Sequence, residues 1–165
     1  MLFVHAAALH AQNPHMDALR TVLVENCVIM EADFQLSMSQ TRMTGKAFIE
    51  AQGDAYVMKT ETMDVYCDGE SIWTVDASSK EVYVEAAVSG GQQGLDAALM
   101  ALMDSDEVDC TFSEDGRLTG MSLSLPDGIS VSATILSFEA VNKKSVTSFR
   151  PQSEFGSDWI VTDLR

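Results

Sequence analysis

Basic residues, histidines and long apolar runs are all scarce in this 165-residue chain. Ten lysines and arginines stand against 25 aspartates and glutamates, giving a formal net charge of −15. Phosphate backbones and anionic lipid headgroups are bound through Lys and Arg, so this balance argues against nucleic acid as a partner and against tight residence on membranes. No run reaches the roughly 18 apolar residues of a membrane span, and stable membrane insertion is not expected.

Histidine is confined to the first fifteen residues, at His5, His10 and His15. The body of the chain therefore has no imidazole for Ser-His, Cys-His or HExxH chemistry, and GxSxG, GxGxxG and P-loop patterns are absent as well. The acidic run from Asp104 to Asp109 lacks the glycine and the terminal glutamate of a calcium loop, and a solvated helix end is the better interpretation. We expect no enzyme, no cofactor and no metal site.

The three cysteines, Cys27, Cys67 and Cys110, lie far apart and form no CxxC pair or zinc-type spacing. An odd number cannot pair completely within one chain. A disulfide between Cys67 and Cys110 is one alternative, because both fall in predicted strands. Buried free thiols are the favoured one.

The first twelve residues, Met1 to Gln12, are mostly apolar and small and give way to polar Asn13-Pro14. This pattern is typical of the end of a secretory signal peptide with its small-residue cleavage zone. An ordinary N-terminal helical turn is the alternative. We therefore predict a signal-peptide remnant at 1–12, a single domain at 13–165, and export to the periplasm or beyond.

Two periodicities organise the domain. Asn13-Pro14 predicts a helix start, and apolar residues then recur at helical spacing up to about Asn26. From Val28 to Met38 the period changes to two, which predicts a long strand with one buried and one wet face. Further strands are expected at 45–59 with a break near Gly53, 63–67, 72–75, 81–86, 108–112, 119–125, 129–141 and 159–162.

A second amphipathic helix is predicted from Leu95, Leu99, Leu102 and Met103. Nine or ten strands in consecutive hairpins form an antiparallel, strongly twisted meander, and the apolar stripes of two helices must cover one of its faces. The fold class expected is α+β: a strongly curved antiparallel sheet forming an unclosed β-barrel with helices over its mouth.

Methionine is unusually frequent, with ten residues spread over the predicted strands and the second helix. Because methionine is flexible and polarizable, it fills irregular gaps in a core, and it also suits surfaces that repack around variable apolar partners. Gap filling and an adaptable lining for acyl chains are both open interpretations of the sequence.

Several motifs follow one another in a recognisable order. They are Gly45-Lys-Ala-Phe48, Gly53-Asp-Ala-Tyr-Val-Met58, the D-G-x-x-x-W pattern from Asp68 to Trp73, and Lys80-Glu-Val82, with the ending Trp159 to Arg165. In this order they resemble the periplasmic lipoprotein carriers of the LolA family, in a divergent and shorter form. Where the better-known carriers have an arginine-proline pair, this chain has Lys59-Thr-Glu-Thr62.

The resemblance implies an unclosed barrel whose apolar cavity receives the acyl chains of a lipoprotein or lipid. A soluble monomeric carrier of this kind takes its load from an inner-membrane release complex and passes it to an outer-membrane receptor. A lipid-sensing or protein-interaction domain on the same fold, without transport, is the alternative. The expected lipid-binding residues are Met30, Phe34, Leu36, Met38, Ile49, Tyr56, Met58 and Trp73 in the wall, with Leu95, Leu99, Leu102 and Met103 in the lid.

Overall fold

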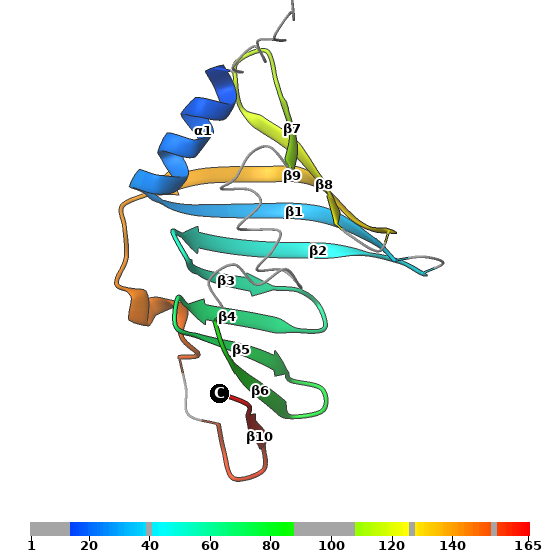
Figure 1. The fold of residues 1–165 in the computed structure, drawn as a ribbon, viewed down its shortest axis with the longest axis vertical. Coiled ribbons are helices and arrows are strands. Elements are labelled where there is room, and N and C mark those ends of the chain that lie inside the picture. Colours follow the sequence, from blue (N-terminus) through cyan, green and yellow to red (C-terminus); the bar gives the residue numbers. More distant parts are fainter. Residues whose placement is uncertain (1–13, 39–40, 88–107, 126–127, 153–154) are drawn as a thin grey trace, which may run out of the picture.

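The computed structural model describes residues 14–38, 41–87, 108–125, 128–152 and 155–165. This part of the chain forms one helix and one ten-stranded sheet (Figure 1). The predicted signal-peptide remnant at 1–12 and the predicted second helix around 95–103 lie outside the described residues.

The helix is α1 (Pro14–Glu25), and a short 3-10 turn, η2 (Val146–Phe149), follows the last long strand. The strands, in chain order, are β1 (Cys27–Met38), β2 (Thr41–Gln52), β3 (Ala55–Lys59), β4 (Asp64–Asp68), β5 (Ser71–Asp76), β6 (Glu81–Ala86), β7 (Val108–Phe112), β8 (Leu118–Leu125), β9 (Ile129–Val141) and β10 (Ile160–Asp163).

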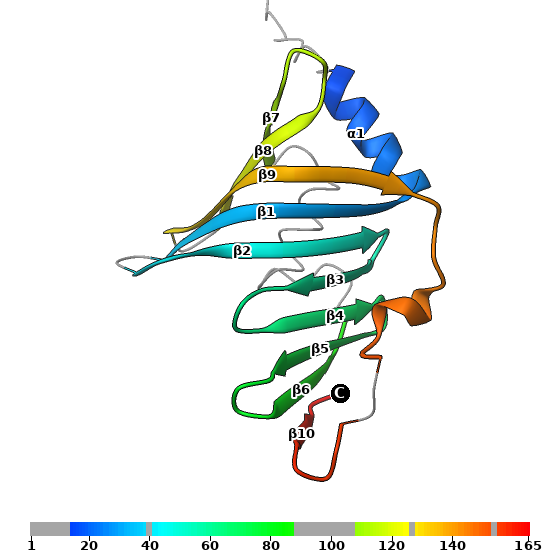
Figure 2. The same ribbon diagram turned by 180° about the vertical axis from the view of Figure 1, so that it is seen from behind.

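The strand order is β10-β6-β5-β4-β3-β2-β1-β9-β8-β7. Two antiparallel meanders, β1 to β6 and β7 to β9, are joined where β9 returns to pair along the whole of β1. Within this order β7 and β10 are the two ends, so the described sheet is unclosed. In Figures 1 and 2, β7 and β8 run steeply across the direction of β1 and β2, which is the twist expected of a long antiparallel sheet.

The two faces of the sheet are covered by different parts of the chain. We call the face that carries Val28, Met30 and Phe34 the helix face, because α1 packs on it. The opposite face, which carries Ile29, we call the tail face. Residues 146–152 and 155–165, here called the tail, supply the side chains that pack on this second face.

Helix α1 begins at Pro14, whose fixed φ suits a first helical position, and the amide of Asn26 closes its last turn by donating to the Val22 carbonyl at 3.0 Å. Leu19 and Leu23, four residues apart, are its buried side chains. They pack with Val28, Met30, Val108, Leu118 and Leu123 of the sheet. Burying each leucine stabilises the fold by about 1.5–3 kcal/mol.

The tail packs through aromatic side chains. Phe149 of η2 is fully buried against Cys27 and Val57, while Phe155 and Trp159 lie against the valines of β5 and β6. The chain then ends in β10, which runs parallel to β6. This parallel edge strand differs from the all-antiparallel meander expected from the sequence, because η2 packs on β3 and β4 and residues 155–159 already lie beside β5 and β6 before the last strand begins.

Candidate ligand-binding face

An apolar band covers the helix face where β1, β2 and β9 extend beyond α1. In the register of the sheet, Leu36 lies between Met43 of β2 and Val131 of β9. The side chains of Met38 and Met43 are 37% and 50% exposed. The apolar band consists of Phe34, Leu36, Met38, Met43, Ile129, Val131 and Ala133.

The same stretch of sheet is polar on the tail face. Asp33, Gln35 and Ser37 alternate with the apolar residues of β1, and their neighbours on β2 and β9 are Arg42, Thr44, Lys46, Ser130, Ser132 and Thr134. If both faces of this stretch were in contact with water only, its apolar and polar residues would not need to lie on opposite faces. Met38 and Met43 are exposed in this band and the other members are half-buried, and apolar surface gathered in one place is typical of contact sites.

The band continues into a buried cluster on the same face. Tyr56, Met58, Val65 and Cys67 of β3 and β4 pack there with the small residues Ala47 and Ala51. Phe34 joins the two regions, because its ring packs against this cluster from the end of the band. Gly45 makes this possible, since a Cβ at that position would lie 3.0 Å from Phe34 Cε1.

The structure brings seven of the eight predicted wall residues onto one face, where Met30, Tyr56 and Met58 are buried. Phe34, Leu36, Met38, Ile49, Tyr56 and Met58 share the helix face. Met30 shares it too but is buried beneath α1. Trp73 lies on the opposite, tail face, where it packs in the cluster of Phe155 and Trp159. The predicted lid residues Leu95, Leu99, Leu102 and Met103 lie outside the described residues.

One polar atom is sealed inside the cluster on the helix face. Tyr56 is only 5% exposed, and its hydroxyl has no hydrogen-bond partner in the described part of the chain. Buried hydroxyl groups are normally satisfied. This one stands out because the residues packed around it are apolar.

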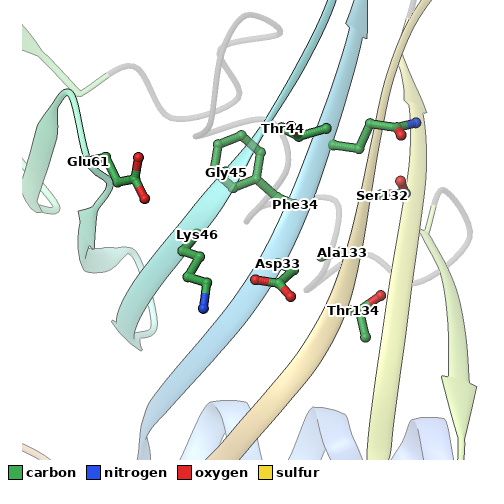
Figure 3. Close-up of a pocket in the computed structure, with 10 residues that line it drawn as sticks. Asp33, Phe34, Thr44, Gly45, Lys46, Glu61, Ser132, Ala133 and Thr134 are labelled. Carbon is green, nitrogen blue, oxygen red and sulfur yellow. The ribbon is translucent and has the colours of Figure 1, made fainter.

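A depression of about 580 Å³ lies over the polar side of the same strands (Figure 3). Asp33 and Lys46 occupy paired positions of β1 and β2, and Glu61 reaches the depression from the turn after β3. The lining is Asp33, Phe34, Gln35, Thr44, Gly45, Lys46, Glu61, Ser132, Ala133 and Thr134. Hydroxyl, amide and charged groups make up most of this lining, and Phe34 and Ala133 of the apolar band also border it.

The D-G-x-x-x-W motif anchors the tail to the sheet. The Asp68 carboxylate accepts the amides of Glu70 and Ser71, both at 2.9 Å, and the Nε–H of Arg150 at 2.5 Å. Burial raises the pKa of Asp68, but these amide and guanidinium hydrogen bonds outweigh it and hold the pKa below its ordinary value. The sequence pattern marked Asp68-Gly69 as a turn and contained no signal for its partner 82 residues away.

The turn between β3 and β4, formed by residues 60–63, is closed by Thr60. Its hydroxyl accepts the amides of Thr62 and Met63 at 3.3 and 3.1 Å, and its own amide donates to the Met63 carbonyl at 3.0 Å. The neighbouring Lys59 ammonium lies 5.9 Å from the centre of the Tyr66 ring. Lys59 is therefore directed toward the tail face rather than the apolar band.

All three cysteines are free thiols, which confirms the favoured alternative, with Cys27 and Cys67 buried and Cys110 half-buried. Burial, followed by the nearby Glu50 carboxylate, raises the pKa of Cys27 to about 11. Within the described residues, no group of three or more His, Cys, Asp or Glu side chains is arranged to hold a metal ion.

Comparison with known proteins supports the fold and gives no information about function. No family model matches the chain, and no curated protein does so. One similar solved structure is an uncharacterized conserved protein from Thermus thermophilus, which is 9% identical with a TM-score of 0.52 over 91% of this chain and 97% of that one. In the described part of the chain, no helix has the length and apolarity needed to cross a bilayer.

Proposed function

We propose that the protein is an exported carrier that binds the acyl chains of a lipoprotein or lipid on its helix face, as the LolA-like carriers it resembles do. Shuttling through the periplasm toward the outer membrane is the transport role this implies. The observation that carries the proposal is the apolar band, with Met38 and Met43 exposed on it while the polar residues of the same strands face the other way.

The energetics suit reversible binding. Transfer of an acyl chain from water to an apolar surface gains about 0.8 kcal/mol for each buried CH₂, so partial burial of one chain is enough for capture. Methionine side chains adapt to chains of different shape, and a sheet without closure leaves a route for release. No nucleotide is required, because partner proteins can supply the direction of transfer.

Mass spectrometry of organic extracts from natively purified protein tests the proposal, together with displacement of a bound apolar dye by a triacylated peptide. The proposal predicts extractable acyl lipid and displacement of the dye. A protein that yields no lipid and retains the dye contradicts it.

Adjacent residues on β2 provide a matched pair of variants. Met43→Glu places a carboxylate in the apolar band, whereas Thr44→Glu places the same charge on the tail face, and both positions are exposed. We expect Met43→Glu to weaken binding of the triacylated peptide at least tenfold, because the charge loses its hydration beneath the chain. Thr44→Glu should change the affinity less than twofold. Equal effects of both variants would contradict binding on the helix face.

A protein-interaction domain is the second candidate, and the free edge strand favours it. Ile160, Val161 and Leu164 are exposed on or beside β10, which ends the sheet. Exposed edge strands bind extended peptides by adding a strand. An interaction domain would bind a partner without yielding lipid and would be insensitive to Met43→Glu.

A further inference from the structure

The buried Tyr56 hydroxyl gives the proposed ligand a chemical requirement beyond its hydrocarbon chain. We propose that this hydroxyl donates a hydrogen bond to the carbonyl oxygen of an ester- or amide-linked acyl group, so that the protein selects acylated molecules over plain hydrocarbons. This inference rests on the proposed function, since it places the ligand on the helix face.

The Tyr56 hydroxyl makes no hydrogen bond within the described residues. Tyr56 is 5% exposed, and its neighbours in the cluster are Ala47, Ala51, Met58, Val65 and Cys67. The Cys67 thiol is engaged elsewhere, with the Asp54 carbonyl at 3.5 Å and the Gly69 amide at 3.4 Å. An unsatisfied buried hydroxyl is destabilising, so phenylalanine would serve packing alone better.

The path from Tyr56 to the exposed band is apolar throughout. Tyr56 lies opposite Ala51, and Phe34 lies opposite Gly45, six residues earlier on β2. At about 3.3 Å per residue these positions are about 20 Å apart along the strand. The hydrocarbon chains of one bilayer leaflet span about 15 Å, so a single acyl chain fits this length.

The side chains along this path can make room. Met58 is part of the cluster, Met63 and Phe34 pack against it, and Ala47 and Ala51 present little bulk. Methionine changes rotamer readily, so an entering chain displaces flexible side chains rather than backbone. Pockets for apolar ligands usually combine such walls with a few polar groups that fix orientation, and Tyr56 supplies one.

The test compares Tyr56→Phe with the wild type, using methyl palmitate and hexadecane as competitors of a bound apolar dye. Tyr66→Phe is the matched control, because the Tyr66 hydroxyl donates to Asp64 on the tail face at 3.2 Å. We expect Tyr56→Phe to weaken methyl palmitate about threefold to tenfold, the effect of one lost hydrogen bond, and to leave hexadecane unchanged. Tyr66→Phe should alter neither affinity.

The infrared carbonyl stretch of bound methyl palmitate gives a second readout. A hydrogen bond lowers this frequency in the wild type and in Tyr66→Phe, and the shift should disappear in Tyr56→Phe. Equal losses for both competitors, or no loss and no frequency change, would overturn the role of Tyr56 while leaving the carrier intact. If neither competitor displaced the dye from the wild type, the proposed function itself would fail, and this inference with it.

Discussion

At the scale of single residues, the buried Asp68 carboxylate attaches the tail to the sheet. The Asp68 side chain is only 2% exposed, and it joins the turn between β4 and β5 to the tail through Arg150. Arg165 adds a second contact by donating to the Ser71 hydroxyl at 3.1 Å. The tail is therefore attached at the same turn by two cations, in a chain that has few.

Removing one partner of the Asp68–Arg150 pair should destabilise the fold in a pH-dependent manner. We expect Arg150→Ala to lower the free energy of unfolding by about 1–3 kcal/mol at pH 7, because a buried carboxylate loses a charged donor. The pKa of Asp68 is lowered in the folded state, so the wild type keeps this stabilisation above the unfolded pKa of about 4 and loses it as the pH falls below that value.

Urea unfolding between pH 2 and 7 measures this effect. The curves of Arg150→Ala and the wild type should converge at the acid end. Arg117→Ala is the control, since the Arg117–Asp115 pair is exposed on both sides. Parallel curves for Arg150→Ala and the wild type over the whole range would contradict the proposed attachment.

The thiol of Cys27 should be unreactive in the folded protein. With its pKa raised to about 11 by burial and then by Glu50, only about 0.1% is thiolate at pH 8. Mass spectrometry after iodoacetamide treatment should find Cys27 unmodified in native protein and fully modified in guanidinium. Rapid labelling of the native protein would show that the tail does not keep this site closed.

At the scale of elements, most of the sheet could be predicted from residue patterns. The alternation from Val28 to Met38 places the helix-face residues of β1 correctly, and Asp68-Gly69 and Asp115-Gly116 mark turns whose glycines have φ of +90° and +80°. These signals are local. The return of β9 to β1 and the parallel pairing of β10 depend on contacts between distant residues, and no local pattern encodes them.

Trp73 shows why the sequence could not place every predicted wall residue on the same face of the sheet. The sheet is packed with side chains on both faces at β5, where Ile72 points to one cluster and Trp73 to the other. A strand with apolar residues on both faces has no clear alternation, so its sequence does not say which side lines a cavity. The aromatic residues of the tail, Phe155 and Trp159, occupy the face that Trp73 joins.

The tail should be essential for folding rather than an appendage. Phe149 is fully buried within η2, whereas Val146, three residues earlier, is exposed. Phe149→Ala is expected to cost about 3–5 kcal/mol, as for other buried aromatic residues. Val146→Ala should change the free energy of unfolding by less than about 0.5 kcal/mol. Chemical denaturation of both variants gives the comparison, and a small effect of Phe149→Ala would contradict a structural role for the tail.

At the scale of the whole molecule, the two faces of the sheet differ in the residues that pack on them. The chain carries a formal charge of −15, and a negative surface potential of this kind disfavours contact with phosphate groups. The apolar band and the Tyr56 cluster occupy one face of the sheet, while the tail and the polar depression occupy the other. This separation is compatible with the proposed carrier, for which we expect binding to depend on burial of the acyl chain and not on headgroup charge.

Binding of an acylated ligand on the helix face is tested most directly by a nuclear magnetic resonance titration of protein labelled at methionine and isoleucine methyl groups. The added ligand is a triacylated peptide. Met38 and Met43 report on the apolar band, Ile29 on the tail face of β1, and Ile160 on the free edge. If the ligand binds on the helix face, the resonances of Met38 and Met43 should show saturable shifts, and those of Ile29 and Ile160 should show none. Saturating peptide that leaves both methionines unchanged would contradict binding on this face.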